Sequence, residues 1–300
     1  MNRRHFLQQS SLLATGLATL PACSTMRSTT EVAYPMGYQL FSVRDVMKDD
    51  PLGTLKALKQ MEYAHFEIYG YDAERNDIYG YKPDEFRRVL ADLDLLATSG
   101  HFGFNAHLTT PLADLDRYTD RCIAGARAAG LDYLVWPFLA PDQRDLESFR
   151  RLAPRLNRIG ERVTAAGLGF AFHNNGYEWQ DLGNGQVGYD IILAETDPAL
   201  VKLQLDMYWC MKEGRTTPKE VIANNSGRVH LWHIKDMHKV SRDYTELGNG
   251  SLDYTTLMPD PATSGLKHFY IEQGGNFTLD SMTSAKVSAE YFKTTLREFV

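Results

Sequence analysis

The feature that most restricts how this chain can fold is a regular alternation of short apolar runs with longer amphipathic segments. Eight apolar runs predict strands at residues 38–43, 65–69, 95–101, 133–136, 169–173, 201–206, 229–236 and 269–272. Helical periodicity, with proline at first turns and glycine past last turns, predicts helices at residues 51–61, 83–93, 112–129, 145–166, 189–195, 218–224, 254–258 and 279–299. Strands that alternate with helices in this way build a parallel sheet.

The number of these units selects the kind of parallel sheet. Eight strand–helix units in one stretch of this length match a closed barrel. An open, doubly wound sheet is the alternative, but no Gly-x-Gly-x-x-Gly turn follows the first apolar run. No Ser/Pro-rich linker, charge block or repeat divides the stretch. We therefore predict a single-domain α/β fold, a (β/α)8 TIM barrel, over residues 35–300.

The first residues carry the pattern of an export signal. Arg3 and Arg4 precede a short apolar run without acidic residues, and Cys23 follows the sequence Leu-Pro-Ala. This pattern predicts a twin-arginine signal peptide at residues 1–22, with lipoprotein-type cleavage before Cys23; plain cleavage after Ala22 is the alternative. The run is shorter than the roughly 20 apolar residues that span a membrane. We expect a periplasmic protein on a flexible tether (residues 23–34), in contact with the membrane only through a lipid on Cys23.

Charge excludes one class of partner. The chain has 32 basic and 38 acidic residues, and removal of residues 1–22 takes away two arginines and no acid. The mature chain would keep 30 basic residues against 38 acidic ones, a net charge of −8. Nucleic acid binding requires a basic face, so we expect no nucleic acid partner.

The cysteines outside the signal pattern leave two arrangements open, free thiols or a disulfide. Besides Cys23, the chain has Cys122 in a helical stretch and Cys210 just after the sixth strand. We predict that both are free and buried. A disulfide between them is the alternative in an oxidising compartment.

The predicted strands five to eight end in residues that bind metals. His173, Asp206, His233 and Glu272 each come at or near the end of one of these apolar runs. Because consecutive strands of a barrel lie side by side, their carboxyl ends meet on one rim. Imidazole and carboxylate groups suit zinc, manganese, cobalt or iron. The sequence therefore predicts one divalent metal held by these four residues.

Further residues near the same rim are candidates for chemistry and binding. Glu178, five residues after His173, is a candidate base that would project over the metal, with a solvated loop acid as the alternative. Lys235 is a candidate for holding a developing negative charge. The candidate substrate-binding residues include Glu67 and His101, for which packing is the alternative role. Trp209 could stack on a sugar face, and Arg44 could help to bind a phosphate.

Several of these segments resemble one known family. The sequence is similar to the sugar phosphate isomerase/epimerase family of xylose-isomerase-like barrels, and in two places to its exported branch. The resemblance spans almost the whole mature chain and is specific for the superfamily rather than for one reaction. It rests on Phe172-His173-Asn174-Asn175, Leu205-Asp206-Met207-Tyr208-Trp209, His233-Ile234-Lys235-Asp236, Tyr270-Ile271-Glu272-Gln273, Gln39-Leu40-Phe41-Ser42-Val43-Arg44-Asp45 and Leu247-Gly248-Asn249-Gly250-Ser251.

The resemblance implies one divalent metal (manganese, cobalt, magnesium or zinc) and a sugar substrate. It places the ligands on Asp206, His233, Glu272 and, where many members have Glu, on His173. The sequence departs from the family at two positions. Asn175 stands where the exported branch has His, and Trp209 stands where many epimerases have His.

The expected activity is removal of a proton next to a metal-bound carbonyl of a sugar, with Glu178, Glu272 and Lys235 as catalytic residues. Return of the proton gives an isomerase or epimerase. Loss of a leaving group gives a lyase or dehydratase, for which export favours a keto-sugar or 3-keto-glycoside substrate. A lipid-tethered sugar-binding protein is the non-enzymatic alternative. The acidic charge disfavours an abasic-site endonuclease, whose barrel is similar.

Overall fold

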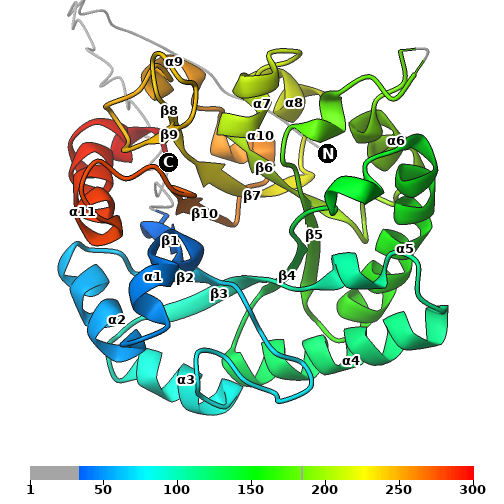
Figure 1. Cartoon of the computed structure of the whole chain (residues 1–300), viewed down its shortest axis with the longest axis horizontal. Coiled ribbons are helices and arrows are strands. Elements are labelled where there is room, and N and C mark those ends of the chain that lie inside the picture. Colours follow the sequence, from blue (N-terminus) through cyan, green and yellow to red (C-terminus); the bar gives the residue numbers. More distant parts are fainter. Residues whose placement is uncertain (1–33, 184) are drawn as a thin grey trace, which may run out of the picture. The chain divides into compact units, whose positions relative to one another are not determined.

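Eight parallel strands close into a barrel, as the alternation predicts (Figure 1). The structure is a computed structural model that describes residues 34–183 and 185–300; the predicted signal peptide, Cys23 and tether residues 23–33 lie outside the described residues. Around the barrel the order is β1-β10-β7-β6-β5-β4-β3-β2, and β1 closes it by pairing with both β2 and β10. The strands are β1 (Gly37–Gln39), β2 (His65–Ile68), β3 (Leu96–His101), β4 (Tyr133–Trp136), β5 (Gly169–His173), β6 (Lys202–Asp206), β7 (Val229–Ile234) and β10 (His268–Ile271).

Helices surround the strands (Figure 1). The longer ones are α2 (Pro51–Gln60), α3 (Pro83–Ala91), α4 (Leu112–Ala129), α5 (Leu146–Ala165), α6 (Gly188–Glu195), α8 (Pro218–Asn224) and α11 (Ser281–Tyr291). Shorter helices are α1 (Arg44–Met47), α7 (Met207–Glu213), α9 (Tyr254–Leu257) and α10 (Pro261–Ser264), and β8 (Asp236–Met237) pairs with β9 (Tyr244–Thr245). The 3-10 helices are η1 (Leu40–Val43), η2 (Phe104–His107), η3 (Pro141–Gln143), η4 (Tyr177–Trp179) and η6 (Arg297–Phe299), and η5 (Phe292–Leu296) is a π-helix. No helix in the described part of the chain is both long enough and apolar enough to cross a bilayer.

The helix ends follow from local sequence. Asp145 begins α5 by accepting a hydrogen bond from the backbone N–H of Ser148 at 2.7 Å. Gly130 ends α4 in the left-handed conformation, with φ of 78°, which glycine adopts without strain. Pro154 lies inside α5 without ending it, on the exposed side of the helix.

Three predicted elements differ from the structure. The first strand ends at Gln39 rather than at residue 43, because the Gln39 side chain accepts a hydrogen bond from the N–H of Phe41 and turns the chain into η1. The seventh strand ends at Ile234, and Asp236 begins the short β8. The last helix changes from α to π geometry at Phe292. In the first strand and the last helix, the apolar pattern continues past the point where the backbone changes.

Side-chain alternation along the strands separates the barrel interior from its outer wall. A small buried cluster consists of Tyr133, Val135, Ala171, Leu231 and Tyr270. Three of the predicted ligands, His173, His233 and Glu272, each come two residues after a member of this cluster. The cluster therefore closes the barrel interior below the rim where the predicted ligands lie.

The outer side of the strands packs against the helices. Trp232 is fully buried there, and its Nε1 donates a hydrogen bond to the Ser264 hydroxyl at 2.8 Å. Cys122 and Cys210 are free and buried, as predicted.

Asp236 organises the loop that follows β8. Its carboxylate accepts hydrogen bonds from the backbone N–H groups of Met237, Gly248, Gly250 and Leu252, at 2.7 to 3.1 Å. A Cβ on Gly250 would lie 2.1 Å from the carboxylate, so only glycine allows this approach. The Gly-Asn-Gly sequence thus folds around one buried acid.

We predict that Asp236→Ala lowers the free energy of unfolding by about 3 kcal/mol, because buried N–H groups lose a charged acceptor. Urea denaturation measures this change. The matched control is Asp243→Ala, since exposed Asp243 accepts a single hydrogen bond from the N–H of Tyr244, and its loss should change stability by less than about 1 kcal/mol. Equal effects of the two substitutions would contradict the role given to Asp236.

Candidate active site

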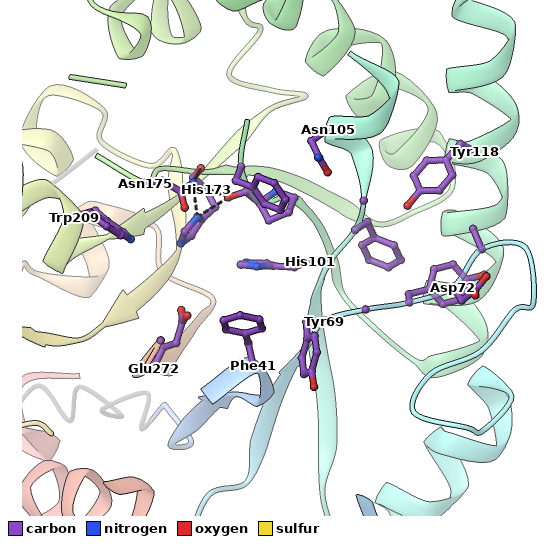
Figure 2. A pocket seen from close by; sticks show the side chains of 18 of the residues that line it. Phe41, Tyr69, Asp72, His101, Asn105, Tyr118, His173, Asn175, Trp209 and Glu272 are labelled. Carbon is purple, nitrogen blue, oxygen red and sulfur yellow. Dashed lines mark hydrogen bonds between the residues drawn. The ribbon is translucent and has the colours of Figure 1, made fainter. Parts of the chain in front are cut away.

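The four predicted metal ligands converge at the carboxyl ends of their strands. His173 ends β5, Asp206 ends β6, His233 is the second-last residue of β7, and Glu272 follows β10. One ligand atom from each lies within 4.8 Å of the other three, and all four residues are buried. Figure 2 shows His173 and Glu272 on the same side of the cavity, with Trp209 beside them.

The four ligand atoms face one another and Lys235, with His233 Nδ1 only 2.6 Å from Glu272 Oε2. His173 Nε2, Asp206 Oδ2, His233 Nδ1 and Glu272 Oε2 are buried and make no hydrogen bond of acceptable geometry to the described residues. Buried polar atoms that make no hydrogen bond are rare in native proteins. His173 Nε2 lies 3.4 Å from Asp206 Oδ2, close to the spacing of atoms that share one ion at about 2.0–2.3 Å. The donor set therefore fits a divalent metal.

Hydrogen bonds on the far side of each imidazole aim the free nitrogen at the cluster. His173 Nδ1 lies 3.0 Å from the carbonyl oxygen of Pro137, so it carries the proton and leaves Nε2 for a ligand. His233 Nε2 lies 2.6 Å from Glu67 Oε2, so it donates and leaves Nδ1. Such outer partners orient metal-binding histidines.

Glu67 lies below the cavity rather than in its wall. The residue is fully buried and is absent from the cavity lining, so the expected contact with substrate is not what the structure shows. Burial alone would raise the pKa of Glu67, but the imidazoles of His101 and His233 lower it well below its usual range. The donors around its carboxylate are Gln39 Nε2 (2.7 Å), Ser99 Oγ (2.6 Å), Gln204 Nε2 (2.7 Å) and His233 Nε2 (2.6 Å), with His101 Nε2 at 3.1 Å. Glu67 is thus a positioning residue for His233.

The charges of the cluster also suit a divalent cation. Lys235 Nζ lies 2.7 Å from Asp206 Oδ2 and 2.9 Å from Glu272 Oε2. Burial alone would raise the pKa values of both carboxyls, but Lys235 holds them below their usual range. Burial lowers the pKa of Lys235, yet the two carboxylates raise it above its ordinary value. Once His233 is neutral, three buried carboxylates, including Glu67, against the Lys235 ammonium leave two negative charges, which a bound divalent cation would balance.

A second arrangement of three histidines shares two of these ligands. His101, His173 and His233 also have nitrogen atoms close enough to one another for a shared ion. The His101 Nε2, however, already lies 2.8 Å from the Gln204 side-chain oxygen. The four-residue set is therefore the better candidate, because its ligand atoms face only one another and Lys235.

A cavity of about 800 Å³ opens above the cluster. His101, Trp209 and Lys235 line it, together with His173 and Glu272, as the sequence predicts. Arg44 does not line it. Its guanidinium carbon lies 4.2 Å from the centre of the Phe41 ring, and its Nη1 donates to the Phe41 carbonyl oxygen.

Glu178 also lies outside the lining, so the expectation that it projects over the metal is wrong. The chain turns at Gly176, with φ of 92°, and takes Glu178 into the wall of the barrel, where it is fully buried. Its Oε2 accepts a hydrogen bond from the N–H of Asn175 at 2.8 Å. Burial raises the pKa of Glu178 to about 8.

Sequence reasoning missed several residues of the site. Gln204 and Ser99, which hold Glu67, have inward-facing positions on their strands, and this alternation was a usable signal. The aromatic lining residues Phe41, Tyr69, Phe138 and Tyr244 lie on loops, short turns or β9, where no periodicity marks them.

We predict that Glu67→Gln weakens metal binding by roughly 10–100-fold, because the amide presents N–H groups to several donors and no longer holds His233. Competition with a chelator for added zinc or manganese measures the affinity. Asp206→Ala, which removes a ligand, should lose the metal. The control is Asp72→Asn, an acid of the cavity wall outside the cluster. Unchanged affinity in a folded Glu67→Gln protein would rule out the positioning role.

Metal binding should also release protons. Burial lowers the pKa of His233, but the carboxylates of Glu67 and Glu272 raise it to about 9 in the metal-free protein. The imidazole is then protonated at pH 7 and must lose its Nδ1 proton to bind metal, so about one proton should leave per ion. Affinity should therefore fall as the pH drops below about 9. Calorimetry in buffers with different ionisation enthalpies measures the release, and none at pH 7 would contradict ligation by His233.

Comparison with known proteins agrees with this fold. The structure is similar to a sugar phosphate isomerase/epimerase from Parabacteroides distasonis (TM-score 0.75, 21% identity, 93% of this chain and 99% of that chain). It is also similar to the IOLI protein with a binding zinc atom (TM-score 0.67, 13% identity, 89% and 99%) and to the probable 3-DHS dehydratase AsbF from Bacillus anthracis (TM-score 0.64, 12% identity, 86% and 98%). No curated protein matches the sequence. Residues 55–271 match the family described as xylose isomerase-like TIM barrel, and the chain belongs to that family.

Proposed function

We propose that this protein is a divalent-metal-dependent sugar isomerase or epimerase that removes a proton from a carbon next to a carbonyl group. The observation that carries the proposal is the group of four buried ligand atoms that converge within 4.8 Å of one another beneath an open cavity. Lys235 pairs with the two carboxylates of this group, and a bound cation would balance the remaining buried negative charge. The similarity to a sugar phosphate isomerase/epimerase and to a zinc-binding barrel supports it.

The metal, whether manganese, cobalt, magnesium or zinc, would be held by His173, Asp206, His233 and Glu272, and when bound it supplies a Lewis acid that polarises the substrate carbonyl. Lys235, beside two of these ligands, adds a fixed positive charge where negative charge develops on the substrate oxygen. His101 and Trp209 line the cavity and are placed to contact the sugar hydroxyls and ring face.

Glu272 is the proposed proton acceptor. It lines the cavity, whereas Glu178 does not. Its lowered pKa keeps it ionised, and thus able to accept a proton, throughout the physiological pH range. A carboxylate of low pKa is a weak base, so the reaction depends on the cations that acidify the substrate C–H bond. Return of the proton to the other face gives an epimer, and its return to the neighbouring carbon gives an isomer.

Elimination is the second candidate reaction, and the charges of the cavity favour a substrate for it without phosphate. Lys235 contacts two carboxylates, and Arg75, the other basic side chain in the described lining, lies 2.8 Å from Asp72. An uncharged keto-sugar or 3-keto-glycoside fits this cavity better than a phosphorylated sugar. After proton removal, the C–O bond one carbon further breaks, the leaving oxygen takes the electron pair and a proton, and an unsaturated ketone remains.

Export is proposed on the sequence alone. Arg3, Arg4 and Cys23 form the signal pattern described above, and we propose that the barrel acts in the periplasm, tethered through a lipid on Cys23. This location agrees with a substrate that lacks phosphate.

The test is solvent exchange. The metal-loaded protein, incubated with a panel of keto-sugars and 3-keto-glycosides in deuterated water, should introduce deuterium next to the carbonyl of at least one compound. Glu272→Gln, at metal concentrations that saturate it, should lower the exchange rate at least 100-fold. Glu178→Gln, a buried carboxyl changed in the same way, is the control and should keep it.

Two outcomes would contradict parts of this proposal. Absence of exchange with every compound, while the metal stays bound, would favour a sugar-binding protein. Loss of exchange in Glu178→Gln but not in Glu272→Gln would assign the base to Glu178, despite its place in the wall.

A further inference from the structure

We infer that the cavity contains a second subsite, next to the metal end, that binds an uncharged ring carried on the sugar through a glycosidic bond. The inference rests on the proposed function, because the sugar itself is placed at the metal ligands. It makes the substrate a glycoside rather than a free or phosphorylated monosaccharide. The ring is either a second sugar or an aromatic group.

The cavity extends well beyond the metal end. In Figure 2 the lining runs from Trp209, His173 and Glu272, past His101 and Phe41, to Tyr118 and Asp72. Its volume of about 800 Å³ lies in the upper part of the range, roughly 300–1,000 Å³, that encloses drug-sized ligands. A single sugar ring at the metal would leave much of this space to water.

Two exposed aromatic rings line the space. Phe41 is 38% exposed and Phe138 is 41% exposed, and they are the only phenylalanines in the described part of the chain that are so exposed. Both belong to this one cavity although they come from different loops, η1 and the segment after β4. Exposed apolar surface gathered at one place marks a binding site. Flat apolar rings bind the faces of sugars and of aromatic groups.

The Phe41 ring is held in place before any ligand binds. Tyr69 contacts it edge to face, with ring centres 5.4 Å apart, and the Arg44 guanidinium lies 4.2 Å from its centre. A side chain fixed in this way loses little conformational entropy on binding. Arg44 thus supports an aromatic wall instead of contacting a phosphate.

The far wall offers hydrogen bonds without net charge. Arg75 pairs with Asp72, and Glu74 pairs with Arg121. The Asn105 side chain lines the cavity and makes no hydrogen bond to the described residues, so its amide is free for a hydroxyl group of the ligand. Paired charges disfavour an ionic ligand, and the aromatic walls with one free amide suit a neutral, partly apolar ring.

Binding of unreactive glycosides tests the subsite separately from the chemistry. Calorimetry of the metal-loaded protein would compare methyl glucoside, which has one ring, with phenyl glucoside and methyl cellobioside, each in both anomeric forms at the reducing position. These compounds have no carbonyl group and are not turned over. At least one two-ring compound should bind about tenfold or more tightly than methyl glucoside. Comparison of phenyl glucoside with methyl cellobioside shows whether the subsite prefers an aromatic ring or a second sugar.

Substitutions show which side chains cause the tighter binding of two-ring compounds. Phe41→Ala and Phe138→Ala should each remove most of it and leave methyl glucoside binding within about twofold of the wild type. Because both side chains are exposed, the variants should fold, which thermal melting verifies. Leu112→Ala, an exposed apolar residue outside the cavity, is the control and should keep the gain.

Two results would overturn the inference: equal affinity for one-ring and two-ring compounds, or a gain that survives in the Phe41→Ala/Phe138→Ala double variant. Failure of the proposed enzymatic function gives a different pattern, in which the two-ring gain is present but no keto-sugar exchanges deuterium.

Discussion

The site depends on one buried anion that several strands share. The Glu67 carboxylate on β2 accepts hydrogen bonds from Gln39 on β1, Ser99 on β3, Gln204 on β6 and His233 on β7. A buried charge is tolerated only when its lone pairs are satisfied, and here the satisfying groups come from around the barrel. The same bonds fix which nitrogen of His233 faces the cluster. The hydrogen bonds to Glu67 thus both connect strands of the barrel and orient His233 as a candidate metal ligand.

The parts of the site that could be predicted lie on strands. His173, Asp206 and His233 are read from the sequence because each ends an apolar run, and parallel strands bring such ends to one rim. Glu272 comes one residue after the end of β10, so the same argument predicts its position. In these positions the backbone leaves a side chain few directions, so residue order determines location.

The parts that could not be predicted lie where the backbone leaves regular geometry. Glu178 follows His173 closely, but the positive φ of Gly176 turns it into the wall. Phe41 was expected within a strand, and a single hydrogen bond from its N–H to the Gln39 side chain puts it in a turn that faces the cavity. Apolar periodicity predicts neither the positive φ of Gly176 nor the hydrogen bond at Gln39. Each of these features decides whether a side chain lies in the barrel wall or in the cavity.

This division between strands and loops has a consequence for specificity. The buried carboxylates, Lys235 and the two ligand histidines set the charge at the metal end, and their positions are fixed by strand pairing. Phe41, Phe138 and Asn105 sit on loops and turns, which accept substitution without disturbing the barrel. In the proposed reaction, the strands would thus supply the groups for proton removal next to a carbonyl, and the loops would select the group attached to the sugar.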